Sequence, residues 1–438
     1  MTRRAHPLAM LLALLLLVGC GQRNAPTEIV IQRFFGECGA VYGSSTNVKA
    51  ADGECGILTT LLNRFQAQNP DIRLKLNIVA WPGYPQLSAQ VAAGDPPDLV
   101  TMHQSVISDY QGLGLLEPMD AMLAQAGYPA DRFTEAGRAG VVKGGQAYGL
   151  PFDTVGGLFH INTGLMRQAG LMRGDTPILP TSPAQLLEHA RRFKAATGKP
   201  YLIQAQVNDP ASHVRNLYTY LLAQGVDIFP DARHVRLRGP EAHAVVTLFR
   251  RLNAEGLTTR DQDFPAANTS FINGEGGVFP VGTWMIGPYD KEAATPGRPL
   301  HDSYAVLPFP RLWGREAAFV DGHAWVAPTR QRTPEQRAAI VRLLRFLARN
   351  DEEWARTGHL PAMAEVLSRP SFAALPHRAD IAEMARTGRQ LPDHVRRQSA
   401  VQGLIGEEVE SAVNGNKPVD RALADAERRV NELFAQML

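Results

Sequence analysis

The sequence has little of three features that would each point to a particular class of protein. Only 3 of its 438 residues are cysteine, too few for a disulfide-dense scaffold or a zinc ribbon. Its 45 basic and 43 acidic residues leave a formal net charge of +2, which gives no electrostatic reason to expect a nucleic-acid partner. Its 39 glycines and 31 prolines stay below the roughly 25–30% typical of low-complexity chains. These scarcities leave an ordinary globular protein as the starting expectation.

What is present supports a large folded body. Hydrophobic residues make up 45% of the chain and charged residues 20%, so a sizeable core can form and global disorder is excluded. Domains usually span roughly 100–200 residues, so the length predicts two or three domains or one large bilobal body.

The first twenty residues predict export. Arg3 and Arg4 precede an apolar run, Leu8–Val18, that is too short to span a bilayer, because a spanning helix takes about 20 residues. A positive flank followed by a short apolar stretch is typical of a secretory signal. The run ends in Leu17-Val18-Gly19-Cys20, which resembles the bacterial lipobox, in which the cysteine is lipidated and begins the mature chain. The alternative is a plain signal peptide with an incidental cysteine.

If the lipobox resemblance holds, residues 1–19 are the lipoprotein signal peptide and residues 20–27 are a lipidated tether. Removal of Arg3 and Arg4 with the signal leaves a mature chain of zero net charge. We then expect a protein anchored through Cys20 that does not span the membrane.

Export also changes how the remaining cysteines are interpreted. Cys38 and Cys55 would lie in an oxidising compartment, on either side of a stretch without helical or strand period. A disulfide closing this loop would add on the order of 3 kcal/mol of stability in the chain-entropy model. Two free thiols are the alternative. No CxxC, clustered histidines or HExxH spacing suggests a metal, so we expect no metal and no other cofactor.

The first part of the body alternates between strand and helix patterns. Strands are predicted at 28–34, 73–79 and 98–102, and helices at 57–68 and 86–93. This order is typical of a parallel α/β sheet.

A second series starts near Tyr148. Strands are predicted at 158–162 and 199–205, and helices at 183–198, 214–224 and 240–255. Capping-box patterns at Ser182–Gln185 and Thr333–Gln336 mark helix starts. The region from Arg378 to the C-terminus is predicted to be mostly helical.

Five segments in order resemble the extracellular solute-binding proteins of ABC importers, in the branch that includes maltose-binding protein. They are Gly94–Val100 (GDPPDLV), Tyr148–Pro151 (YGLP) with Leu158–Asn162, Phe271–Phe279 with Gly282-Thr283-Trp284, Gly322–Ala327 with the helix after Thr333, and Gly358–Pro361. Each segment alone is a weak signal, and the order makes the resemblance specific.

The resemblance implies two α/β lobes joined by three hinge crossings, the type II periplasmic-binding-protein fold. Lobe one would comprise residues 28–152 and 310–358, and lobe two residues 156–308 and 361–438. It also implies a monomeric receptor, in the periplasm or cell envelope, that binds a sugar or oligosaccharide between its lobes. Its partners would be the permease subunits of an ABC transporter in the inner membrane. Two departures are the cysteine-bearing insertion after the first strand and His160, where the family often has tyrosine.

Sugars present flat C–H faces and hydroxyl rims, so their sites need aromatic platforms and planar polar side chains. The resemblance places a stacking tryptophan at Trp284. Trp325 lies on a predicted strand whose start would edge the cleft, and Trp81 directly follows a predicted strand. For each, packing in the core is the alternative.

Polar candidates also follow predicted strands or lie in crossings. They are His103, Gln104, Asp153, Asp321, Glu37 and Asp209. Caps, turns and loop contacts are the competing roles for these side chains.

Two other classes of function stay open at this point. One is a receptor for a polyamine, iron or a peptide. The other is an exported carbohydrate-active enzyme, which we do not expect because no G-x-S-x-G, HExxH or P-loop spacing appears. A role in sensing through a chemoreceptor would share the same fold.

Overall fold

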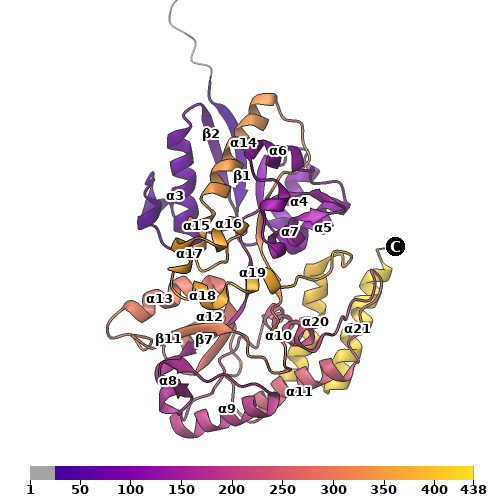
Figure 1. Ribbon diagram of the computed structural model, residues 1–438. Helices are drawn as coiled ribbons and strands as arrows, with labels where there is room; N and C mark the ends of the chain where they lie inside the picture. Colours follow the sequence, from indigo (N-terminus) through magenta and orange to yellow (C-terminus); the bar gives the residue numbers. More distant parts are fainter. Residues whose placement is uncertain (1–24, 438) are drawn as a thin grey trace, which may run out of the picture.

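The computed structural model describes residues 25–437, so the predicted signal peptide, Cys20 and most of the predicted tether lie outside the described residues. The chain forms two α/β lobes, drawn one above the other in Figure 1. Between residues 25 and 437, no helix combines the length and the hydropathy needed to cross a membrane.

Lobe one is built on a five-stranded sheet of order β2-β1-β3-β13-β6. β1 pairs in parallel with β2 and β3, whereas β13 is antiparallel to β3 and β6. Alternation buries Ile29 and Ile31 of β1, as the sequence pattern predicts. The strands are β1 (Thr27–Arg33), β2 (Ile72–Ile78), β3 (Leu99–His103), β6 (Gly149–Pro151) and β13 (His323–Val326).

Helices cover this sheet. In α14, the Thr333 hydroxyl accepts from the Gln336 N–H (3.2 Å) while the Gln336 side chain accepts from the Thr333 N–H (3.0 Å), which completes the predicted capping box. The helices of lobe one are α2 (Gly39–Tyr42), α3 (Gly53–Gln68), α4 (Tyr84–Ala92), α5 (Gln104–Gly112), α6 (Asp120–Ala126), α7 (Glu135–Val141), α14 (Pro334–Arg349) and α15 (Asp351–Ala355).

Lobe two is built around β7, which is buried throughout and pairs antiparallel with β10 and β11. Ser182 caps α9 as predicted, accepting from the Gln185 N–H at 3.1 Å. The strands are β7 (Val155–Asn162), β10 (Val278–Gly282), β11 (Tyr304–Pro308) and β12 (Val320–Asp321), with the short pair β8 (Met172–Arg173) and β9 (Thr176–Pro177). The helices are α8 (Thr163–Gln168), α9 (Pro183–Thr197), α10 (Pro210–Gln224), α11 (Pro240–Ala254), α12 (Phe264–Ile272), η3 (Thr283–Met285), α13 (Ile286–Ala294), α20 (Gln398–Val413) and α21 (Val419–Ala435).

Three details differ from the expectations. The strand predicted at 199–205 is reduced to isolated bridges at Leu202, because the Gln204 N–H donates to the Thr259 hydroxyl (3.0 Å) instead of to a neighbouring strand. β12 still pairs with β7, so the chain returns to lobe one at Gly322 rather than near residue 310.

The third difference concerns the segment after residue 361, which the resemblance places in lobe two but which first packs against lobe one. Met363, Phe372 and Met384 belong to the core cluster that contains the strands of lobe one. The segment carries α16 (Ala364–Leu367), α17 (Pro370–Ala373), α18 (Arg378–Ile381) and α19 (Met384–Thr387), which lie at the boundary between the lobes in Figure 1.

Strand direction decides which edges of the two sheets meet. β6 runs parallel to β3, because both are antiparallel to β13, and the chain passes from the carboxyl end of β6 directly into β7 of lobe two. Lobe two is therefore attached at the carboxyl edge of β1, β2 and β3. In lobe two, Gly282 at the end of β10 pairs with Gly157 near the start of β7, so the residues after β10 also lie near the crossings.

Candidate functional site

The carboxyl edge of the lobe-one sheet carries an aromatic group centred on His103. The His103 ring stacks on Phe34 (centroids 5.2 Å apart, 7° between planes) and meets Trp81 edge-on at 5.7 Å. Its Nδ1 lies 2.6 Å from the Tyr84 hydroxyl. Trp81, directly after β2, stays 70% exposed. An exposed indole supported from below by packed rings is a suitable platform for a flat apolar surface.

The electrostatics at this edge favour an uncharged imidazole. Burial lowers the pKa of His103 to about 3, helped by the neighbouring His323 and opposed by Asp153. At neutral pH His103 is thus a polar but uncharged group beside Trp81.

The facing edge of lobe two carries Trp284, Arg215 and Asp209. Trp284 is partly buried in η3, and the guanidinium of Arg215 from α10 lies 5.6 Å from its ring centre. Asp209 caps α10, accepting from the Ser212 N–H at 3.1 Å, and its other oxygen lies 3.8 Å from Arg215.

Arg215 has unused donors at this position. Its side chain is 24% exposed, and within residues 25–437 its guanidinium donates no hydrogen bond. Burial lowers its pKa, with Asp209 acting in the opposite direction. A half-buried cation with free N–H groups is favourable only if water or a ligand supplies the acceptors.

Trp325 belongs to the core of lobe one. It is 1% exposed in β13, and its ring packs at 5.6 Å from Phe152. A side chain this deeply buried in the core offers no surface for stacking on a sugar.

Asp153 is fully buried in the first crossing, residues 152–154 between β6 and β7, and holds to it the second crossing at Gly322 between β12 and β13. It accepts from the His323 N–H (2.7 Å), from His323 Nδ1 (2.8 Å) and from the Trp354 indole N–H (2.8 Å). Burial alone would raise the pKa of Asp153, but His323 and His359 hold it below its usual value. Burial would likewise lower the pKa of His323, yet Asp153 raises it. The two residues form a buried ion pair rather than free ligand contacts.

Gln104 and Asp321 also fasten the lobes. The Gln104 side chain donates to the carbonyls of Asp153 (3.2 Å) and His323 (3.3 Å), and it accepts from Gln390 (2.6 Å). Asp321 accepts from the Ser105 N–H (3.0 Å) and hydroxyl (2.6 Å), at the start of α5.

Glu37 remains exposed in the insertion after β1. Its carboxylate accepts from the Gly39 N–H at 2.6 Å, which favours the loop role over a ligand contact.

Three buried side chains, Asp153, His323 and His359, are close enough together to be considered as metal ligands, but protein contacts already explain their arrangement. Asp153, His323 and His359 each place one possible ligand atom within 4.8 Å of the others. Both His359 nitrogens already contact protein groups, the Thr283 hydroxyl (3.0 Å) and the Glu54 carboxylate (2.7 Å). The structure therefore accounts for these residues as a hydrogen-bonded network.

Sequence reasoning did not find Phe34, Tyr84, His323, Arg215 or His359. Phe34 is hidden because an aromatic residue directly after a strand has the same pattern as a core residue, and Tyr84 because it begins helix α4. Arg215 lies inside a helix, and only the packing of α10 on η3 brings it to Trp284.

The profile of the bacterial extracellular solute-binding protein family matches residues 60–380, more than half of the chain. No curated protein sequence matches the chain. The family and the similar solved structures are binding proteins rather than enzymes.

Several solved structures share the fold. The cyclic alpha-maltosyl-1,6-maltose binding protein from Arthrobacter globiformis has a TM-score of 0.74 at 18% identity, covering 94% of this chain and 100% of its own. The sugar-binding protein MalE from Xanthomonas citri has a TM-score of 0.76 at 17% identity, covering 94% and 98%. Maltose-bound T. maritima MalE3 gives 0.73 at 19% identity, covering 93% and 100%. These likenesses show the bilobal type II fold, and the profile match shows that the chain belongs to the bacterial extracellular solute-binding protein family.

Proposed function

We propose that this protein is a receptor outside the cytoplasm that binds a di- or oligosaccharide between its two lobes and delivers it to an ABC permease. The observation that carries the proposal is the pair of tryptophans at the facing edges of the two sheets. Trp81 is exposed on the lobe-one edge, and Trp284 lies on the lobe-two edge beside Arg215.

The chemistry around these tryptophans suits a neutral sugar. Indole faces stack on the C–H faces of sugar rings, and uncharged His103 and the free N–H groups of Arg215 can bond to hydroxyls. Asp209 lies 3.8 Å from Arg215, so the local charge is balanced and gives no preference for an anion. The structural neighbours named as maltose- or sugar-binding proteins agree with this ligand class.

The other ligands fit the described residues less well. Tyr218 and Tyr220, the tyrosines that would be considered for iron, lie in the core of lobe two and are 5% and 1% exposed. A polyamine would need free carboxylates, but Asp153 and Asp321 already bind His323 and Ser105. The same pairing leaves neither acid free for general acid–base catalysis, which argues against an exported carbohydrate-active enzyme.

The membrane attachment is a separate part of the proposal. It rests on the lipobox resemblance at Cys20 and on the family, whose members act outside the cytoplasm. Replacement of Cys20 by alanine should move the protein from the membrane fraction to the soluble fraction, and unchanged fractionation would contradict lipidation.

A thermal-shift screen of mono-, di- and oligosaccharides tests the ligand class. A saccharide at 100 times its dissociation constant should add about 2.7 kcal/mol of stability. Trp81→Ala and Trp284→Ala should each weaken binding of that saccharide by about 1–3 kcal/mol in calorimetry. Leu113→Ala is the control, because Leu113 is also exposed but follows the far end of α5. Absence of any saccharide-induced shift, or unchanged affinity in both tryptophan variants, would overturn the proposal.

A further inference from the structure

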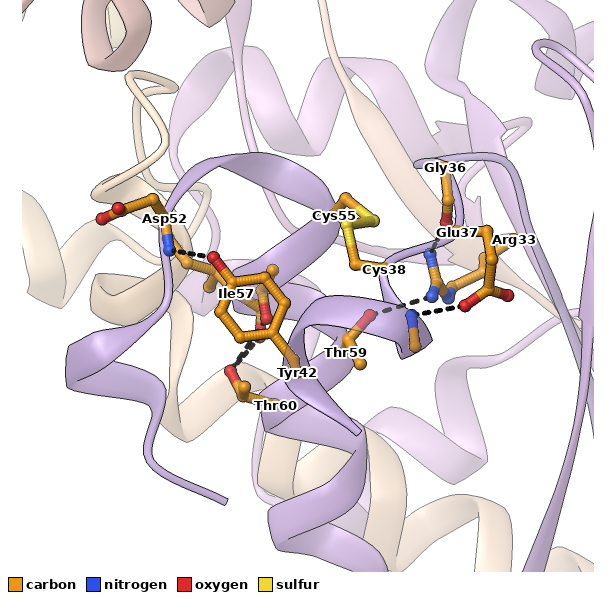
Figure 2. Close-up of a disulfide and its surroundings, with 12 residues drawn as sticks. Arg33, Gly36, Glu37, Cys38, Tyr42, Asp52, Cys55, Ile57, Thr59 and Thr60 are labelled. Atoms are coloured by element: carbon orange, nitrogen blue, oxygen red, sulfur yellow. Dashed lines mark hydrogen bonds between the residues drawn. A yellow bond between two sulfur atoms is a disulfide. The ribbon is translucent and has the colours of Figure 1, made fainter. Parts of the chain in front are cut away.

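The insertion between β1 and α3, residues 36–52, is a closed unit fastened to α3. Cys38 and Cys55 form a disulfide, and the Tyr42 hydroxyl accepts from the Asp52 N–H at 3.1 Å (Figure 2). The Asn63 side chain of α3 donates to the carbonyls of residues 43 (2.9 Å) and 45 (3.0 Å). The loop therefore presents a defined surface rather than a free coil.

That surface binds the segment that follows α15, residues 356–361. The Arg356 guanidinium donates to three insertion carbonyls, those of Val48 (2.8 Å), Ala51 (3.0 Å) and Lys49 (3.2 Å). The Lys49 ammonium pairs with Glu353 of α15 at 2.9 Å. A planar guanidinium that reaches three fixed carbonyls determines the orientation of the chain that carries it.

From this clamp a hydrogen-bonded chain leads to Trp284. Glu54, next to Cys55, accepts from His359 Nε2 at 2.7 Å, and His359 Nδ1 lies 3.0 Å from the hydroxyl of Thr283. The Glu54 carboxylate can only accept, so His359 Nε2–H is the donor of that bond, while Nδ1 contacts the Thr283 hydroxyl. His359 and Thr283 are fully buried, whereas the Glu54 side chain is 34% exposed, so the bond to Thr283 is shielded from water and the bond to Glu54 lies at the edge of the buried region.

The backbone approaches closely at the same place. Gly358 has φ +120°, and a Cβ there would lie 2.2 Å from the carbonyl oxygen of Thr283. Only glycine allows the segment after α15 to pack against the residue before Trp284.

We propose that the disulfide-closed insertion positions Trp284, with Glu54 and Arg356 as positioning residues that act through His359 and the segment after α15. Neither residue touches the ligand in this proposal. The inference rests on the proposed function for its effect on affinity, while its effect on the structure of η3 is independent of any ligand.

Hydrogen exchange of the ligand-free protein tests the structural part. In Glu54→Ala the His359 N–H loses its acceptor, and exchange at amides 283–286 should accelerate by about tenfold, as for one lost buried hydrogen bond. The double variant Cys38→Ala/Cys55→Ala should show the same local increase. Glu54→Gln keeps an acceptor oxygen and should return exchange to the wild-type rate. Val41→Ala is the control within the insertion, since Val41 is 77% exposed.

Calorimetry with the saccharide found in the screen tests the functional part. Glu54→Ala and Arg356→Ala should bind it about tenfold more weakly, and Glu54→Gln and Val41→Ala should bind like wild type. Wild-type exchange and affinity in Glu54→Ala would overturn the inference and leave the receptor proposal intact. Faster exchange at 283–286 in a protein that binds no saccharide would support the positioning role and overturn the receptor proposal instead. If the cysteine variant fails to fold, the comparison of Glu54→Ala with Glu54→Gln still decides the outcome.

Discussion

Acid should destabilise this protein through His160, which supports the backbone just before Trp284. His160 is fully buried in β7. Its Nε2–H donates to the carbonyl of Gly282 at 3.2 Å, and its Nδ1 accepts from the Tyr304 hydroxyl at 2.8 Å. Burial lowers the pKa of His160 to about 3, because the charged ring would lose its hydration.

Proton linkage gives the sign and the size of this effect of pH on the free energy of unfolding. An unfolded histidine has a pKa of about 6.5, so the unfolded chain takes up the proton first as the pH falls. The contribution of His160 is therefore fully present above about pH 6.5 and is lost progressively down to about pH 3. Between about pH 7.5 and pH 5 the loss amounts to about 2 kcal/mol of unfolding free energy.

Urea unfolding at these two pH values measures the effect. In His160→Gln, which keeps an N–H donor but cannot titrate, the pH dependence should shrink by about 2 kcal/mol relative to wild type. His234→Gln makes the same replacement at a histidine whose ring is exposed on the surface, and it is the control for the substitution itself. An unchanged difference between the two pH values in His160→Gln would refute the assignment of a neutral buried imidazole.

Three further changes test the roles assigned to other side chains. Asp153→Asn should destabilise the protein by about 3–5 kcal/mol near pH 6. The loss should be smaller at pH 9, because the raised pKa of His323 means that its contribution fades as the pH rises through that value. Trp325→Ala should cost about 3–5 kcal/mol in urea unfolding through the cavity it leaves, with unchanged saccharide affinity per folded molecule; weaker binding at equal stability would return it to the ligand site. Arg215→Met, which removes the donors but keeps apolar cover on Trp284, should weaken saccharide binding by about 1–3 kcal/mol in calorimetry, and unchanged affinity would contradict a ligand contact.

Local patterns predicted most of the elements because they depend on neighbours in sequence. The alternation in β1 and β2 and the capping box at Thr333 each need only a few consecutive residues to form. Such features appear in the structure within a few residues of the predicted bounds. The disulfide between Cys38 and Cys55 could also be predicted locally, because it joins residues only 17 positions apart in the sequence.

The polar residues of the site could not be predicted in this way. Asp153 has its partner 170 residues away in His323, and Gln104 meets Gln390 across 286 residues. An acid or amide in a crossing has the same sequence pattern whether its partner is a ligand or a distant protein group. Only the topology that brings the crossings together separates the two roles, and here it assigns both side chains to the connection between lobes.

Because these polar side chains connect the lobes, we expect ligand selectivity to depend on the residues that hold the two tryptophans in place. Trp284 lies in η3, a turn of three residues that has too few hydrogen bonds to hold its own geometry. Its position depends instead on supports from outside: His160 on the preceding carbonyl, His359 on Thr283, and Arg215 over the ring. Because stacking energy falls steeply with small displacements of a ring, changes in these supports should alter affinity without touching the sugar. Saccharide preference in this receptor should therefore respond to substitutions in the insertion and in β7 as well as to those at the two tryptophans.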